Sequence, residues 1–180
     1  MTHTLTVQVV FRAGRGREAR LYRDQKESLP GATVWTHVGI LFGQVVCHAS
    51  PGRLNETPDD QGRYPGSGVI VEPLASFIHT DIAQNGAFLD AADLAEDQSQ
   101  QIISWCMNHA QRHTPFDGTY DLKNERALYC TELVWKAFAT AGVTLCSPPF
   151  TVKKIPFIGG REIILPGHLA NSGRLSCSIK

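Results

Sequence analysis

The 180-residue chain has no excess charge of either sign, because 17 basic residues balance 17 acidic ones. A protein that binds nucleic acid or an anionic membrane through its overall field usually carries a clear positive excess. We therefore expect neither partner. The one local exception is the segment 11–26, which is rich in arginine. Such a run is most often a solvated face, with a site for a specific anionic partner as the alternative.

Long hydrophobic runs are also lacking. No apolar stretch is long enough to cross a bilayer, which argues against stable membrane insertion. The N-terminal residues MTHTLTVQVVF alternate between polar and apolar instead of forming the continuous apolar block of a signal peptide. We expect a soluble protein that stays in the cytoplasm of the producing cell, with export by a signal-less route as the alternative.

The cysteines lack the spacing of a structural site. They are odd in number and include no C-x-x-C pair, which argues against a disulfide framework and against a zinc ribbon. Reduced thiols, no cofactor and no metal are the expectation. The five positions are Cys47, Cys106, Cys130, Cys146 and Cys177.

The order of predicted elements favours an α+β fold in a single domain, residues 1–180, with a largely antiparallel sheet. Alternation and β-branched content predict the strands, and apolar periodicity predicts the helices. Residues 51–68 are dense in proline, glycine and acidic residues and predict a long loop. Strands are expected at 4–11, 32–42, 45–50, 69–78, 161–165 and in an apolar stretch after Pro149, and helices near Arg17, at 93–112 with Asp93 as cap, and at 130–141.

The segment ALYCTELVWKAFATAG, residues 127–142, puts Cys130 in the first turn of an amphipathic helix that ends at Gly142. Unpaired N–H groups and the positive end of the helix dipole lower a thiol pKa at this position. Free cysteine is also among the most buried residue types. Cys130 is therefore either a nucleophile or a packing residue.

A cysteine nucleophile needs a base, and the base needs a group to orient it. Two of the seven histidines, His37 and His48, lie in strands joined by the tight turn Gly43–Gln44. On one face of such a hairpin, opposite side chains are about 5 Å apart at Cβ. Each histidine could instead bond only to backbone, or both could bind a metal with Cys130. Their spacing matches no zinc motif, which disfavours the metal.

A family resemblance is carried by THVGILFGQVVCHASPG, FDGTYDLKNERALYCTELVWKAFATAG and ILPGHLANS, together with VVFRAGRG. With these stretches the chain resembles the permuted NlpC/P60 proteins of the YiiX/YebB-like group. The resemblance runs from Val9 to Ser172. It implies a circularly permuted papain-like fold with Cys130 as nucleophile and His37 as general base.

The resemblance is weaker at the third catalytic position. Members of this group often have a glutamate where this chain has His48, whereas lecithin retinol acyltransferase-like proteins have a second histidine. His48 is expected to orient His37. Tyr120, Asp121 and Tyr129 precede the nucleophile and are candidates to contact substrate, with a core position as the alternative for Tyr129.

These features favour a cysteine hydrolase of amide bonds, acting on a peptide or acyl-amide substrate. The resemblance suggests cell-wall (peptidoglycan) peptides, and the lack of a signal peptide would suit a secreted antibacterial effector whose immunity or delivery partner is unknown. One alternative is a lipid acyl hydrolase or acyltransferase, which the second histidine suggests. A catalytically silent binding module is the other.

Overall fold

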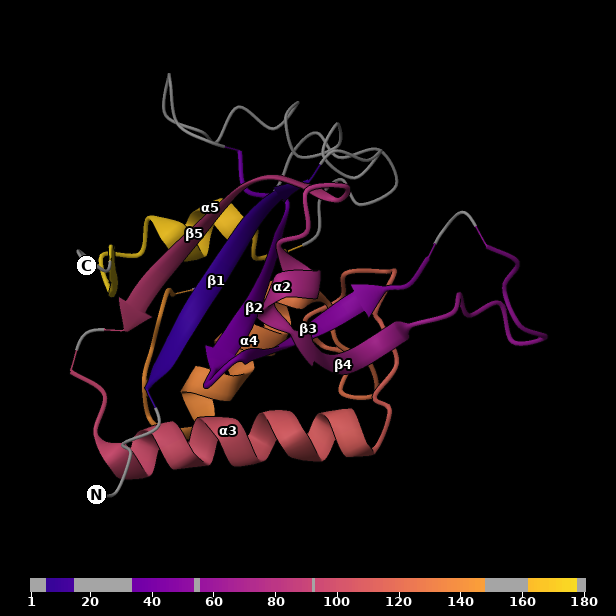
Figure 1. Ribbon diagram of the computed structural model, residues 1–180. Coiled ribbons are helices and arrows are strands. Elements are labelled where there is room, and N and C mark those ends of the chain that lie inside the picture. The colour runs from indigo at the N-terminus through magenta and orange to yellow at the C-terminus, as the bar shows by residue number, and fades with distance from the viewer. Residues whose placement is uncertain (1–5, 15–33, 54–55, 92, 148–161, 178–180) are drawn as a thin grey trace.

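A six-stranded antiparallel sheet lies at the centre of the computed structural model (Figure 1). The structure describes residues 6–14, 34–53, 56–91, 93–147 and 162–177. The strands are β1 (Val7–Gly14), β2 (His37–Phe42), β3 (Val45–Pro51), β4 (Ser67–Pro73), β5 (Ala83–Ala91) and β6 (Leu175–Cys177). Their order in the sheet is β4-β3-β2-β1-β5-β6. The expected α+β class and antiparallel sheet are confirmed.

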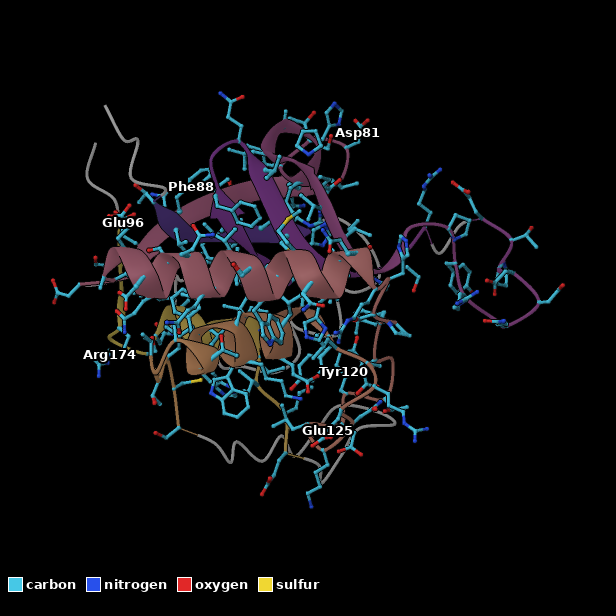
Figure 2. All side chains as sticks on the ribbon, turned by 90° about the horizontal axis from the view of Figure 1, so that it is seen from below. Asp81, Phe88, Glu96, Tyr120, Glu125 and Arg174 are labelled. Atoms are coloured by element: carbon cyan, nitrogen blue, oxygen red, sulfur yellow. The ribbon has the colours of Figure 1, made fainter. Side chains whose placement is uncertain are left out.

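The helices lie on both faces of this sheet. They are α2 (Leu74–Phe77), α3 (Glu96–Gln111), α4 (Cys130–Thr140) and α5 (Pro166–Ala170). Figure 2 shows Asp81, which follows α2, above the sheet and α4 below it. α4 packs against β2 and β3 and also contacts α3 and α5.

Strict alternation of side chains sorts the residues of the sheet between its two faces. The face under α3 and α4 carries Val38, Ile40, Cys47 and Ala49, which join the main apolar core. The other face carries a smaller core of Val10, Leu41 and Val46, which Phe77 of α2 covers. His37 and His48 alternate with the first set, so they belong to the face that α2 covers.

The predicted hairpin is confirmed, with Gly43 and Gln44 as its turn. The first strand begins at His37 rather than at residue 32. The register pairs Ile40 with Cys47, which brings Gly39 opposite His48. The N-terminal strand, the long loop and the Cys130 helix are also present.

The strand predicted at 69–78 is wrong in its second half. β4 ends at Pro73, which has no N–H to continue the ladder, and residues 74–77 form one helical turn. The amide of Leu74 instead donates to the carbonyl of Gln44 in the hairpin turn. This turn brings Phe77 over the histidines.

The strand predicted at 161–165 is also wrong within the described part, since residues 163–165 are not in a strand. The amide and the carbonyl of Ile164 form hydrogen bonds with the side chains of Tyr129 and Thr131 instead of with a neighbouring strand. The predicted helix at 93–112 begins at Glu96, and its cap is Ala95 rather than Asp93. The Gln98 side chain accepts the Ala95 amide, and this bond fixes the start.

Besides α2, three described elements escaped prediction: β5, β6 and α5. β5 contains Asn85 and Gly86, which are poor strand formers, yet it pairs with β1 along its length. The helix expected near Arg17, most of the basic segment and the apolar stretch after Pro149 lie outside the described residues.

Gly39 generates a prediction about the hairpin. An added Cβ would lie 2.6 Å from Val46 Cγ1 and 3.0 Å from His48 Cβ. We expect Gly39→Ala to lower the free energy of unfolding by about 1–3 kcal/mol, because the two strands must move apart. Gly118→Ala, where nothing lies within 4 Å, is the control. Urea denaturation checks both, and equal stability of the two variants would contradict the close packing.

Candidate active site

The sheet brings His37 and His48 together on the face covered by α2. The Nε2 atom of His37 is 2.8 Å from the Nδ1 atom of His48. The two rings meet edge to face with centroids 4.9 Å apart, and both contact the ring of Phe77. Both side chains are buried, so each depends on the other for a hydrogen-bond partner. The predicted proximity of the two histidines is confirmed, but they are diagonal neighbours and not directly opposite, because Gly39 is opposite His48.

Glu72 of β4 extends this pair and was missed by sequence reasoning. Its Oε1 atom lies 2.9 Å from His48 Nε2, and the carboxylate is partly exposed. In β4, Ile70 is directly opposite His48, so Glu72 is its diagonal neighbour on the same face. The alternation of VIVEP was visible in the sequence. The pairing of β4 with β3 was needed to link Glu72 to His48.

The charge state of this network follows from its surroundings. Burial, then the Arg12 guanidinium and His48, hold the pKa of His37 well below its ordinary value. Burial also lowers the pKa of His48, although Glu72 opposes this effect. The hydrogen bond from His48 lowers the pKa of Glu72. At neutral pH the network therefore holds two neutral imidazoles and one carboxylate.

These charge states fix the proton positions. A carboxylate only accepts, so Nε2 of His48 must donate to Glu72. The other nitrogen of the neutral His48 ring, Nδ1, then accepts from His37 Nε2. In the neutral His37 ring this leaves the lone pair on Nδ1. The chain of hydrogen bonds therefore makes His37 Nδ1 the proton acceptor of the site.

Arg12 of β1 lies beside the histidines on the same face. Its Nη1 donates to the carbonyl of Phe77 at 3.0 Å, and its guanidinium stands 4.7 Å from the centroid of the Phe77 ring. The positive charge disfavours an imidazolium next to it. Arg12 thus helps to keep both rings neutral.

Cys130 is the first residue of α4, as the sequence predicts. Its side chain is 3 % exposed and belongs to the main apolar core, on the sheet face opposite the histidines. The helix starts at the end of the sheet where β2 begins. Leu128, two residues before Cys130, donates its amide to the carbonyl of Pro115, and the carbonyl of the preceding residue, Thr114, accepts the amide of Val69. Val69 pairs with Ala49 near the end of β3, and this end of β3 lies beside the beginning of the antiparallel strand β2. Cys130 and His37 therefore lie at the same end of the sheet.

The residues on either side of Cys130 hold the backbone of Ile164. The hydroxyl of Tyr129 accepts the Ile164 amide at 3.1 Å, and the Thr131 hydroxyl donates to the Ile164 carbonyl at 2.5 Å. All three residues are buried. Tyr129 thus occupies the core position that was its alternative, and it anchors the turn that carries the thiol.

Glu132 lies in the same first turn and is buried. Its Oε1 atom is 2.7 Å from Lys136 Nζ, and its Oε2 atom accepts the Tyr129 amide at 3.4 Å. Burial raises the pKa of Glu132 to about 7, although the hydrogen bond and charge of Lys136 oppose this rise. Lys136 and the Tyr129 amide thus each lie against one oxygen of the buried carboxyl group.

Tyr120 and Asp121 lie in the turn before α4. The Tyr120 residue has a left-handed backbone, with φ 54, and its ring contacts the rings of Phe116 and Tyr129. Asp121 donates its amide to Asp117, and its carboxylate accepts the amide of Lys123. Both side chains are partly exposed, which leaves them accessible to a substrate.

The remaining cysteines have other surroundings. Cys47 and Cys106 are buried in the main core, and Cys146 is half-buried. Cys47, Cys106, Cys130 and Cys146 take part in no disulfide. Within the described ranges, no three His, Cys, Asp or Glu side chains gather as metal ligands. No helix among the same residues is long and apolar enough to cross a bilayer.

The buried histidines predict a dependence of stability on pH. Their pKa values in the folded state lie below the ordinary 6.5. The unfolded chain therefore binds protons first as pH falls below 6.5, and stability decreases by up to about 1.4 kcal/mol per pH unit for each proton. Glu72, with its lowered pKa, adds a loss at more acidic pH.

Glu132, whose pKa burial raises to about 7, gains a proton in the folded state over the same range and offsets part of this loss. We expect the melting temperature to fall between pH 7 and pH 5, because two histidines outweigh one carboxyl, and we expect His37→Gln/His48→Gln to remove that fall. His79→Gln is the control, because the His79 side chain is 60 % exposed. Thermal melts across this range provide the measurement. A slope unchanged in the double variant would mean that other groups carry the effect.

The contacts to Ile164 predict an asymmetry between two threonines of α4. Thr131→Val leaves a buried carbonyl unsatisfied and should lower the free energy of unfolding by about 1–3 kcal/mol. Thr140→Val removes a part-buried bond from an exposed residue to the carbonyl of Ala137 in the same helix and should cost about 0.5 kcal/mol or less. Denaturant titration compares them. Similar losses would show that the Thr131 bond contributes nothing particular.

Comparison with known proteins gives the family. A profile described as permuted papain-like amidase enzyme, YaeF/YiiX, C92 family, matches residues 17–177. A solved structure, that of the metalloprotein YiiX from Escherichia coli O157:H7, shares 17% identity over 97% of this chain and 96% of that chain, with a TM-score of 0.69. No curated protein matches. Because the profile covers most of the chain, the protein belongs to the C92 family of permuted papain-like amidases and is an enzyme of that class.

Proposed function

We propose that this amidase uses Cys130 as nucleophile, His37 as general base, and His48 with Glu72 as the groups that orient the base. The observation that supports these roles is the hydrogen-bonded chain from Glu72 through His48 to His37. It leaves Nδ1 of His37 as an acceptor, as a base requires.

The reaction begins when Nδ1 of His37 takes the proton of the Cys130 thiol. The thiolate attacks the amide carbonyl, and the Cys130 amide at the start of α4 stabilises the oxyanion. The imidazolium then protonates the departing amine, which leaves an acyl-enzyme. Water, deprotonated by His37, hydrolyses the thioester and frees the thiol. His48 and Glu72 stabilise the transient positive charge on His37.

This mechanism requires contact between side chains that approach from opposite faces of the sheet. His37 is the first residue of β2, and α4 begins at that end of the sheet. The thiol must therefore reach Nδ1 around the start of the strand. Reactivity of the thiol measures this coupling directly, without any choice of substrate.

We further propose peptide amides as the substrate, with cell-wall peptides as the first class to test. Support comes from a groove beside the nucleophile's turn, whose lining includes Arg63, Ser67 and His113. Polar groups suit a peptide better than an acyl chain, which prefers an apolar tunnel. The second histidine keeps lipid acyl transfer as the competing candidate. Turnover of muropeptides compared with phospholipids decides between them.

A role as an exported antibacterial effector is a separate proposal. It predicts that the protein lyses bacteria when directed to the periplasm and leaves them intact when expressed in the cytoplasm. Cys130→Ala should be harmless in both compartments. Lysis by the Cys130→Ala variant would contradict a catalytic effector.

The catalytic roles predict a graded set of variants. Cys130→Ala and His37→Gln should abolish turnover of a peptide amide, whereas Cys146→Ala should retain it. Loss of a base typically costs 10²- to 10⁴-fold in rate. His48→Ala and Glu72→Gln should cost less than His37→Gln, because they act through the base, and His48→Gln should retain more activity than His48→Ala.

Alkylation of Cys130 by iodoacetamide across pH tests the same roles on folded protein. His37→Gln should shift the pH profile of alkylation, and Glu72→Gln should shift it less. Thermal melts exclude unfolding as the cause, which matters because Cys130 is buried. A profile that does not change in His37→Gln would contradict His37 as the base, and a thiol that resists alkylation at all pH values would favour a silent binding module.

A further inference from the structure

The long loop between β3 and β4, described at residues 52, 53 and 56–66, projects from the sheet as an arm (Figure 1). The limb of the arm that returns to β4, together with Ser67 at the start of β4 and the segment after α3, lines a groove of about 210 Å³. Arg63 and Tyr64 line the groove from the arm, and His113 and Phe116 line it from the other side. The volume suits one side chain rather than a drug-sized ligand, which needs roughly 300 Å³ or more.

The arm has a defined conformation at the groove. The Asp59 carboxylate accepts the amides of Gln61 and Arg63 and also the Arg63 Nε, all at 2.8–2.9 Å. At the base of the arm, Arg53 donates its amide to the carbonyl of Pro65 at 2.9 Å. Arg63 is therefore held in place before any ligand binds.

The same contacts decide which charge the groove presents. Asp59 also lines the groove, but three donors already engage the oxygens of its carboxylate. The hydrogen bond from the Arg63 amide is the main cause that lowers the pKa of Asp59. Among the described contacts, Arg63 uses only Nε in this pair. Its two terminal nitrogens are therefore available to a ligand. A guanidinium with two free terminal donors binds a carboxylate in a bidentate manner. His113, which also lines the groove, adds no negative charge.

The groove lies next to the turn that carries the nucleophile. Phe116 pairs with Leu128, two residues before Cys130. Pro115, which also lines the groove, accepts the Leu128 amide. A peptide whose scissile bond lies at Cys130 would therefore place a neighbouring residue near the groove.

We propose that this groove is a specificity subsite for one carboxylate-bearing side chain of the substrate. Arg63 binds the carboxylate through its terminal nitrogens, and Tyr64 and Phe116 contact the aliphatic stem. This subsite rests on the proposed peptide amidase function. It adds a preference for an acidic residue close to the scissile amide.

The test uses paired peptide amides that differ only in glutamate against glutamine, placed in turn at each position on either side of the scissile bond. At one position, the wild type should prefer glutamate by about tenfold in kcat/KM. Arg63→Ala should remove that preference through a rise in KM that is much larger for the glutamate peptide than for the glutamine peptide, and Arg63→Lys should restore part of it.

Arg53→Ala is the matched control. Arg53 lies in the same arm and forms an exposed pair with Glu56 at 2.7 Å, but it does not line the groove. This variant should keep the preference for glutamate. Equal losses for Arg53→Ala and Arg63→Ala, or equal effects of Arg63→Ala on both peptides, would overturn the proposal.

Calorimetric titration of the same peptides into the Cys130→Ala variant separates the subsite from the chemistry. Tighter binding of the glutamate peptide that depends on Arg63 supports the subsite even if no peptide is cleaved by the wild type. Cleavage without any glutamate preference overturns the subsite and leaves the amidase function intact. Equal binding of both peptides to the Cys130→Ala variant also overturns it.

Discussion

The hydrogen bond between His37 and His48 is the interaction on which the rest of the site depends. Two imidazoles are buried side by side, and each would lose a partner if the other moved. The bond requires the register that brings Gly39 opposite His48, and a slip of one residue would turn His48 to the other face of the sheet. Gly39 permits the approach of the strands because it has no Cβ. The direction of every proton in the network follows from this pair and from Glu72.

Local patterns in the sequence were sufficient for the hairpin and for the helix that begins at Cys130. Both are set by neighbours in the chain: alternation around a tight turn in one case, an apolar stripe ended by a glycine in the other. The family resemblance predicted that they form one site, and the profile match confirms the family. The antiparallel α+β architecture could be predicted for the same reason.

What escaped prediction depends on contacts between distant segments. Glu72 joins the histidines only because β4 pairs with β3, and its strand gives no sign of that pairing. The segment around Ile164 has the composition of a strand, but the hydroxyls of Tyr129 and Thr131 take up its backbone groups. Side chains remote in sequence thus override local propensity at both places. Sequence reasoning could assign residue types to the site but not these partners.

The order of the strands has a consequence for how the site assembles. β2, β3 and β4 follow one another in the chain and lie next to one another in the sheet, so His37, His48 and Glu72 are joined by short-range pairings. Cys130, the proposed nucleophile, belongs to a helix much later in the sequence, and the first turn of that helix is anchored by hydrogen bonds to Ile164, later still. Contacts between near segments close at a lower entropic cost than contacts between distant ones. During folding, the proton-accepting half of the site is therefore able to form as a local unit, and the thiol joins it only when the C-terminal third of the chain has docked.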